Sequence, residues 1–481
     1  MLDHIKHYGQ IFTPEYLVDN ILDTASYQGM DILQKHCMDN SCGDGAFLCK
    51  IISRYAAAYL SQNPANLVGL KHELETYIHG IEKDSAAYDI CICNLNFIAK
   101  DFGIANIKWD IHCTDALSST EYYGKMDFVV GNPPYVRVHN LESDYSTVKT
   151  FQFSQGGMTD LFLVFFELGF RMLSQHGKLC YITPSSWINS LAGLELRRYI
   201  QNHRNLVKLI DLEHYQPFNA TTYTLISLFE NGICNQTFSY SGYDSEKHVE
   251  KPICQLEYDD AFINNILFLA EPDTLKKLRS ILTDYAEHYV SVKNGFATLA
   301  DDIFIRSDFP FQDHLIPVIK ASTGKWYKAL FLYDSTGKPL PRDQIFQSKE
   351  IAKYLEENQH SLLKGKSKED CPDWYLFGRT QALKDVCKAK YSINTCIRDL
   401  NSIKFYSIPA GVGVYSGLYI LTDIDEFKLK RTICSEDFLK YIRSLKKYKS
   451  GGYYTFNSKD LEVFLNFAFS EENNFSFSLS Q

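Results

Sequence analysis

The stretch Met38-Asp39-Asn40-Ser41-Cys42-Gly43-Asp44-Gly45-Ala46-Phe47-Leu48 decides the fold of this 481-residue chain. It predicts a strand that ends near Asp39, a turn built on Gly43 and Gly45, and a helix that follows at once. Glycine adopts positive φ without steric cost, and backbone N–H groups at a helix N-terminus can approach a ligand closely. A plain strand-to-helix turn has the same composition, so the flanking sequence must show whether this turn belongs to a nucleotide-binding sheet.

Acidic residues follow the next two predicted strands. The second strand ends at Glu82, where an open α/β sheet usually holds ribose hydroxyls. The separation from Asp39 exceeds the usual ~20 residues, and an insertion of helix-forming residues at 53–75 accounts for it. A third strand at 109–113 is followed by Asp115, whose carboxylate could accept the amino group of an adenine. Each acid alone is typical of a solvated loop or a helix cap, but their succession favours one nucleotide site.

The fourth strand ends in Asn132-Pro133-Pro134-Tyr135, directly after the apolar run 128–131. An amino group conjugated to a ring or a carbonyl is a poor nucleophile because its lone pair is delocalised. The side-chain oxygen of Asn132 and the carbonyl of Pro133 can each accept one amine hydrogen and so localise that pair. The two prolines fix φ and remove competing donors, and Tyr135 can stack on a planar substrate. The pattern indicates methyl transfer to an exocyclic amine, and a Pro-rich turn that ends a strand is the alternative.

In this order the motifs resemble those of the amino-methylating DNA methyltransferases of the gamma arrangement, which are adenine-N6 enzymes. The resemblance covers residues 9–229 and includes Gly9-Gln10-Ile11-Phe12-Thr13-Pro14, which stands where the family has an N-terminal Gly-Gln-aromatic-aromatic-Thr-Pro element. Asn40 departs from the family, in which proline is commoner. The resemblance implies S-adenosylmethionine as cofactor, no metal, and double-stranded DNA as partner. The implied cofactor-binding residues are Thr13, Asp39, Ser41, Cys42, Gly43, Gly45, Glu82, Asp115 and Pro134, and the implied catalytic residues are Asn132, Pro133, Pro134, Tyr135 and Phe218.

Phe218 belongs to the segment Phe218-Asn219-Ala220-Thr221-Thr222-Tyr223, which resembles the region where the family places an aromatic ring against a flipped base. Together with Tyr135 it would form an aromatic sandwich worth ~1–3 kcal/mol per stacked partner. That gain would partly offset the few kcal/mol needed to extrude a paired base. Ordinary core packing is the alternative for both Phe218 and Tyr223.

The rhythm of short β-rich runs and helical patterns in the first half predicts a mostly parallel sheet. The fold class is therefore α/β. The resemblance implies a Rossmann-like seven-stranded methyltransferase domain at 1–240, followed by a mixed α+β target-recognition domain at 241–481. We expect the last two strands to form an antiparallel hairpin at the sheet edge, and 159–174 to form a buried helix. The predicted strands are 36–39, 77–82, 109–113, 126–131, 178–183, 206–212 and 223–229.

The net charge of −9 is unevenly distributed, which bears on nucleic-acid binding. The first 240 residues hold 17 Lys and Arg against 25 Asp and Glu, whereas the remainder holds 32 against 33. A near-neutral, charge-dense second half permits basic stripes, such as 428–431 and a helix from Lys440 that ends at Gly451-Gly452. A solvated helix face is the alternative. Suitable base-reading side chains are Arg379, Gln381, Arg398 and Asn401.

The composition predicts a cytoplasmic protein without a membrane span, because no 18-residue apolar run is present. The thirteen cysteines lack paired spacing and read as reduced thiols, and the histidines show no metal-ligand pairing. The alternatives left open are an RNA adenine or a protein glutamine as acceptor, a fused restriction nuclease, and a catalytically silent specificity module. Only eight residues precede Gly9, so we expect any restriction endonuclease to be a separate cognate partner.

Overall fold

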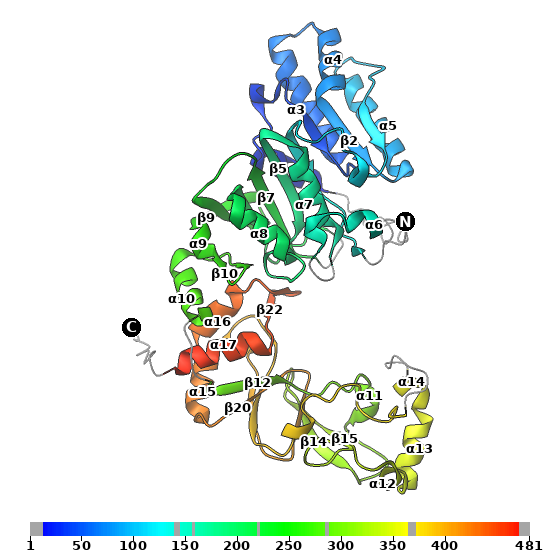
Figure 1. The fold of residues 1–481 in the computed structure, drawn as a ribbon, viewed down its shortest axis with the longest axis vertical. Coiled ribbons are helices and arrows are strands. Elements are labelled where there is room, and N and C mark those ends of the chain that lie inside the picture. Colours follow the sequence, from blue (N-terminus) through cyan, green and yellow to red (C-terminus); the bar gives the residue numbers. More distant parts are fainter. Residues whose placement is uncertain are drawn as a thin grey trace. The chain divides into compact units, whose positions relative to one another are not determined.

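A computed structural model describes residues 13–138, 145–155, 159–218, 222–283, 288–363 and 372–470. The chain divides into two compact units, an N-terminal unit of Met1–Lys276 and a C-terminal unit of Lys277–Gln481 (Figure 1). The predicted boundary at 240/241 is displaced, because the sheet of the N-terminal unit continues to residue 257.

One mixed sheet of nine strands organises the N-terminal unit, in the order β3-β2-β1-β4-β5-β7-β6-β8-β9. The strands are β1 (Cys37–Asp39), β2 (Ile78–Glu82), β3 (Asp110–Cys113), β4 (Met126–Gly131), β5 (Leu173–Pro184), β6 (Leu206–Asp211), β7 (Thr224–Glu230), β8 (Thr237–Asp244) and β9 (Val249–Glu257). Strands β1 to β5 are parallel, whereas β7 runs antiparallel to both β5 and β6. The α/β class and the seven predicted strands are confirmed.

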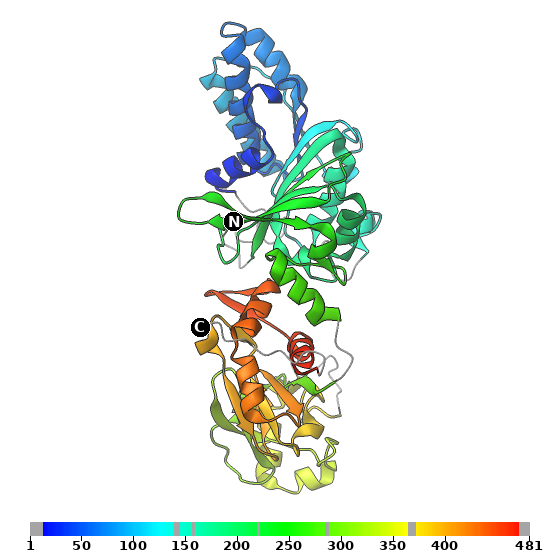
Figure 2. The ribbon, with the colours of Figure 1, turned by 90° about the vertical axis from the view of Figure 1, so that its left-hand side faces the viewer.

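Two further strands correct the prediction of a seven-stranded sheet whose edge is the β6–β7 hairpin. Strand β8 pairs in parallel with β6, and β9 closes the sheet antiparallel to β8. Most residues of β9 are exposed or half-buried, so its sequence is polar and reads as a linker. An outer strand also covers the unpaired edge that β6 would otherwise present to solvent. Figure 2 shows the long strands of this sheet in teal and green.

Helices cover both faces of the sheet, and strand alternation assigns each helix to a face. Side chains of α2, α3 and α5 pack in one core cluster with Phe128, Val130 and Ile182. Helix α7 packs on the other face, where a Cβ on Gly169 would meet Leu179 Cδ1 at 2.6 Å. The predicted buried helix at 159–174 is thereby confirmed. The helices and short turns of this unit are α2 (Glu15–Thr24), η1 (Gly29–Ile32), α3 (Ala46–Gln62), α4 (Leu67–Tyr77), α5 (Ser85–Asp101), η2 (Ala116–Ser118), α6 (Tyr145–Val148), η4 (Gln152–Ser154), α7 (Leu161–Met172), η5 (Ser185–Ile188), α8 (Leu194–His203) and α9 (Tyr258–Ala261), with the hairpin β10 (Phe262–Ile263) and β11 (Ile266–Leu267).

The C-terminal unit is mixed α+β, as predicted, and is built on small sheets with strand orders β12-β20-β16-β18, β13-β15-β14-β19 and β17-β22-β21. Its strands are β12 (Val290–Asn294), β13 (Ile305–Arg306), β14 (Leu315–Lys320), β15 (Lys325–Leu330), β16 (Lys390–Ile393), β17 (Cys396–Ile397), β18 (Phe405–Ile408), β19 (Gly413–Tyr415), β20 (Leu418–Thr422), β21 (Tyr448–Lys449) and β22 (Tyr453–Thr455). Its helices and short turns are α11 (Asp301–Phe304), α12 (Arg342–Phe346), α13 (Lys349–Glu357), α14 (Gln359–Leu363), η6 (Leu383–Asp385), η7 (Leu400–Ser402), α15 (Glu426–Ile433), α16 (Glu436–Ser444) and α17 (Ser458–Phe469), and α10 (Pro272–Thr283) spans the boundary of the units. Buried Asn466 on α17 accepts the backbone N–H groups of Tyr289 and Val290, which fixes α17 to β12.

Candidate active site

The predicted site residues gather at one edge of the sheet because β1, β2, β3 and β4 are parallel. Asp39 pairs in register with Gly80, and Glu82 pairs with Cys113. The segments that leave these strands therefore meet outside the carboxyl edge, the usual ligand position in open α/β sheets.

The glycine turn is held tightly between β2 and α5. Gly43 and Gly45 adopt φ values of 55° and 88°, in the left-handed region that favours glycine. The N–H of Cys42 donates to the carbonyl of Ile81 at 2.9 Å. A Cβ on Gly45 would lie 2.8 Å from Cys91 Sγ, whereas a Cβ on Gly43 would meet no described atom within 4 Å. The turn is thus closed on its inner side and open at Gly43.

Two buried carboxyl groups flank this turn. Glu82 accepts the N–H of Gly43 at 2.8 Å and that of Asp84 at 2.7 Å, so it joins the turn to the end of β2. Asp39 is 1% exposed and accepts the N–H of Ser41 at 3.1 Å. Burial raises the pKa of Asp39 to about 8, against which the hydrogen bond from Ser41 acts only partly. Asp39 therefore holds a proton near neutral pH unless a cationic group approaches it.

Asp115 lies at the same edge, after β3, but its carboxylate already has protein contacts. One oxygen accepts the N–H of Leu117 at 3.0 Å, which begins a short 3₁₀ turn. The other lies 3.0 Å from Lys83 Nζ. A ligand amine would share this carboxylate with Lys83.

The Asn-Pro-Pro-Tyr corner follows β4 and lies beside the glycine-turn strand. A Cβ on Gly131 would lie 2.8 Å from Asp39 Oδ1, so only glycine lets the end of β4 approach Asp39 this closely. The amide of Asn132 donates from Nδ2 to Thr13 Oγ1 at 3.1 Å. This contact brings two predicted site residues together across 119 positions and fixes the plane of the Asn132 amide. Pro133 is buried, and Pro134 is half-buried.

The two rings proposed to hold a base meet, but not as parallel plates. Tyr135 and Phe218 have centroids 6.3 Å apart and planes at 79°, an edge-to-face contact. Tyr135 also donates its hydroxyl to the carbonyl of Ile182 at 3.2 Å and contacts Phe162 edge-on. A sandwich of a planar ring requires parallel faces on both sides, so Phe218 must rotate or shift to form one with the anchored Tyr135. The two rings are neighbours, but the predicted parallel geometry is not that of this structure. Gly9–Phe12 and Asn219–Thr221 lie outside the described residues.

Tyr16, Tyr215 and Tyr243 form a hydrogen-bonded and stacked cluster, here called the tyrosine clasp, that the sequence analysis missed. Tyr16, at the start of α2, and Tyr215, in the segment after β6, join their hydroxyls at 2.5 Å. Tyr243 on β8 stacks on Tyr215 with centroids 5.7 Å apart, and His248 stacks on Tyr16 at 4.1 Å. The clasp links the helix after Thr13 to the segment that ends at Phe218. Tyrosines of this kind carry no spacing signal, because their contacts join segments about 200 residues apart.

The basic helix predicted to end at Gly451-Gly452 ends instead at Ser444, and this prediction was wrong. Both glycines have φ +77° and form the turn between β21 and β22, a conformation that would break a helix. Lys440 and Arg443 remain exposed on α16.

Two of the four suggested base-reading side chains have local partners. The Gln381 amide donates to the carbonyl of Gly295 at 2.5 Å. Arg398 contacts the Asp399 carboxylate at 3.2 Å and lies over the Tyr453 ring. Arg379 and Asn401 are exposed.

The N-terminal unit thus belongs to the α/β class, with one mixed sheet and a polar site at the carboxyl edge of its parallel strands. Residues 76–218 match the family described as the Eco57I restriction-modification methylase. The chain is 27% identical over 247 residues to the Type II methyltransferase M.BstVI of Geobacillus stearothermophilus, covering 46% of this chain and 42% of that protein. It is 25% identical over 375 residues to the Type II restriction enzyme and methyltransferase RM.Eco57I of Escherichia coli, covering 64% of this chain and 37% of that protein.

A solved structure shares the fold over most of the chain. The Type IIL restriction-modification enzyme MmeI, determined in complex with DNA, superposes with a TM-score of 0.61 and 11% identity over 92% of this chain and 63% of that one. The chain spans less than half the length of the two curated relatives.

Within the described ranges, no helix is long and apolar enough to cross a membrane, and no group of three or more His, Cys, Asp or Glu side chains could hold a metal ion. Every cysteine that the structure describes is a free thiol, as predicted.

Proposed function

We propose that this protein is a site-specific DNA methyltransferase that moves a methyl group from S-adenosylmethionine to the N6 amine of a flipped adenine in double-stranded DNA. The observation that carries the proposal is the Asn132 amide, fixed by Thr13 at the end of β4 and adjacent to the glycine turn. Similarity to Type II methyltransferases over nearly half of the chain supports the reaction class.

The residues present fit the cofactor. The open face at Gly43 gives a ligand access to the backbone of the turn, at the N-terminus of the 17-residue helix α3. Glu82 keeps acceptor capacity for ribose hydroxyls, since each carboxylate oxygen can accept more than one hydrogen bond. Asp39 would ionise beside a cationic amine, and Thr13, Asp115 and Pro134 would complete the contacts.

The bound cofactor supplies an electrophilic sulfonium methyl group. Asn132 accepts one N6 hydrogen at Oδ1, and the Pro133 carbonyl accepts the other. These two acceptors would draw the nitrogen lone pair out of the adenine ring and orient the amine for methyl transfer. Catalysis is then mainly orientation and electrostatic polarisation. No residue need be a strong base, because the N6–methyl bond would form as the sulfonium–methyl bond breaks and leaves its electron pair on sulfur. The N6 proton, acidic on the methylated nitrogen, would then leave to water.

The target base requires the aromatic pair to open. We propose that Phe218 swings away from its edge-on contact with Tyr135 and closes on the face of the extruded adenine. Tyr135 is the fixed half of the pair, since its hydroxyl is bound to the backbone of β5. We further propose that the C-terminal unit recognises the DNA sequence and that the protein acts in the cytoplasm.

The test is transfer of a labelled methyl group from S-adenosylmethionine to duplex DNA, RNA and protein acceptors in parallel, followed by mapping of the modified position. Asn132→Ala should abolish transfer while cofactor affinity stays within about threefold. Asn63→Ala is the matched control, because Asn63 is an exposed asparagine at the end of α3.

The outcomes separate the candidate functions. Label on N6 of adenine in DNA supports the proposal, whereas label in RNA or protein with DNA untouched assigns the same corner to another acceptor. Undiminished transfer by Asn132→Ala would exclude the assigned mechanism. Cofactor binding without transfer to any acceptor would identify a silent specificity module.

A further inference from the structure

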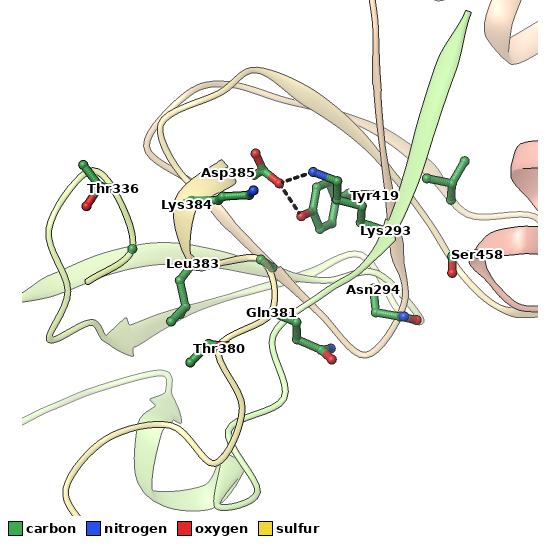
Figure 3. A pocket seen from close by; sticks show the side chains of 13 residues that line it. Lys293, Asn294, Thr336, Thr380, Gln381, Leu383, Lys384, Asp385, Tyr419 and Ser458 are labelled. Carbon is green, nitrogen blue, oxygen red and sulfur yellow. Dashed lines mark hydrogen bonds and ion pairs between the residues drawn. The ribbon is translucent and has the colours of Figure 1, made fainter. Parts of the chain in front are cut away.

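A cavity of about 440 Å³ lies in the C-terminal unit beside the end of β12 (Figure 3). Its walls are the end of β12, the 336–337 turn, residues 380–385, β20 and the start of α17. The 336–337 turn lies directly against the backbone of Lys384, because a Cβ on Gly337 would be 2.8 Å from the backbone nitrogen of Lys384. The polar lining residues are Lys293, Asn294, Thr336, Thr380, Gln381, Lys384, Asp385, Tyr419 and Ser458.

A buried carboxylate organises one wall of this cavity. Asp385 is 1% exposed, and its Oδ2 lies 2.8 Å from Lys293 Nζ and accepts the Tyr419 hydroxyl at 2.9 Å. Its Oδ1 lies 3.0 Å from Lys388 Nζ. Burial acts to raise the pKa of Asp385, but these hydrogen bonds outweigh it and lower the pKa to about 2. Asp385 is therefore ionised and holds the Lys293 amine in a fixed position.

Two lysines and one carboxylate line the cavity, so the charge of its lining is positive. Asp385 is the only acidic residue in the lining, whereas Lys293 and Lys384 line the cavity and Lys388 contacts Asp385 from outside it. A fourth amine, Lys390 Nζ, is not in the lining and donates to the backbone carbonyl of Asp385 at 2.8 Å. Burial lowers the pKa of Lys390 to about 8, which still leaves this amine mostly protonated at pH 7. Among the described residues that line the cavity, one carboxylate thus stands against two amines.

Lys384 is the amine most available to a ligand. It is exposed, and no ion pair of its side chain is found in the described ranges. Figure 3 shows the amines of Lys384 and Lys293 directed toward one another from opposite sides of the pocket.

We propose that this cavity binds a phosphodiester group of a nucleic-acid strand, with Lys384 and Lys293 as the charged contacts. Lysine is a compact point charge suited to phosphate. Hydroxyl and amide side chains of the kind that line the rest of the cavity are common donors to phosphate oxygens in DNA complexes. Asp385 is a positioning residue that holds Lys293 without cancelling the excess charge. The inference rests on the proposed function only in taking nucleic acid, rather than another phosphate compound, as the ligand.

The test measures binding of the full chain to a fluorescent DNA duplex by anisotropy over a series of salt concentrations. Lys384→Gln should weaken binding and reduce the slope of log affinity against log salt by about 0.9, the value for one lost phosphate contact. Lys384→Glu should reduce binding further. Lys353→Gln is the matched control, because Lys353 is an exposed lysine of the same unit on α13 and does not line the cavity. Its salt slope should equal that of the wild type.

A salt slope for Lys384→Gln equal to that of Lys353→Gln would overturn the inference, and methyl transfer to DNA would still stand. Conversely, a Lys384-dependent slope in a protein that transfers no methyl group to DNA would support the cavity as a nucleic-acid site and refute the proposed reaction. Inorganic phosphate at constant ionic strength provides the last arm. If millimolar phosphate raises the thermal midpoint of the wild type but not of Lys384→Gln, while DNA binding is unchanged by the substitution, the cavity takes a free phosphate compound and the nucleic-acid assignment is wrong.

Discussion

Replacing Asp39 with asparagine should abolish a loss of stability that the wild type suffers as pH rises. The Asp39 side chain is buried against the end of β4, and burial raises its pKa to about 8. In the unfolded chain the same carboxyl has a pKa of ~3.9. The native state therefore binds a proton between these values that the unfolded state does not, and the stability gained from it is lost as pH rises toward and through 8.

The magnitude follows from the two pKa values. Between pH 5 and pH 9 the native-state proton of Asp39 is lost, which lowers the free energy of unfolding by about 4 kcal/mol at 1.36 kcal/mol per pKa unit. The asparagine side chain of the variant cannot ionise, although its oxygen can still accept the N–H of Ser41. All other titrating groups are common to both proteins, so they cancel in the difference between variant and wild type.

The assay is urea unfolding of both proteins at pH 5, 7 and 9, followed by tryptophan fluorescence. The stability of Asp39→Asn relative to wild type should increase by about 4 kcal/mol across this range. A difference that stays constant with pH would show that the Asp39 carboxyl is already ionised in the folded protein, and it would refute the account of its burial.

Three further perturbations test the geometry of the N-terminal unit. Tyr215→Phe removes one hydroxyl of the tyrosine clasp, and we expect weaker capture of the target base. The measurement is the emission of 2-aminopurine placed at the target position, which should fall, while cofactor affinity measured by calorimetry stays unchanged. Emission equal to that of the wild type would show that the clasp does not position the segment that ends at Phe218. Gly45→Ala adds a Cβ at positive φ that would lie 2.8 Å from Cys91 Sγ, and it should lower the free energy of unfolding by about 2–4 kcal/mol. Gly43→Ala places its Cβ in open space and should lower it by only about 1–2 kcal/mol. Equal losses in the two variants would refute the packing argument. The hydrogen bond with His79 of β2 is the main cause that lowers the pKa of Asp110 to about 2. The contribution of Asp110 to stability is therefore present above pH ~3.9 and disappears as pH falls through about 2. In acid unfolding, Asp110→Asn should be less stable than the wild type at pH 7 and equal to it near pH 2.

Much of the N-terminal sheet could be predicted because its strands are short, apolar and closed by residues with distinct local chemistry. The end of β1 is marked by Asp39 and two glycines, and the end of β4 by two prolines after Asn132. Turn residues of this kind act through φ and local hydrogen bonds, which depend on immediate neighbours.

The elements that escaped prediction lack such local signals. Strand β9 is polar because most of its side chains face solvent, so its sequence resembles a linker. The helix expected to reach Gly451-Gly452 ended at Ser444, since a run of basic residues reports exposure and not secondary structure. The perpendicular arrangement of Tyr135 and Phe218 depends on packing against Phe162 and Ile182, which no pattern around either ring reveals.

By itself, the sequence determined the α/β class, the succession of strands and the residue types at their carboxyl ends, because periodicity and turn chemistry act over a few neighbouring residues. Only the tertiary structure decided that Thr13 holds the Asn132 amide and that Tyr16 meets Tyr215. It alone also decided that Asp385 is buried between two lysines. These contacts join side chains that are far apart along the chain or on different elements, and they exist only once the sheets and helices have brought those groups within hydrogen-bond reach and excluded water from around them.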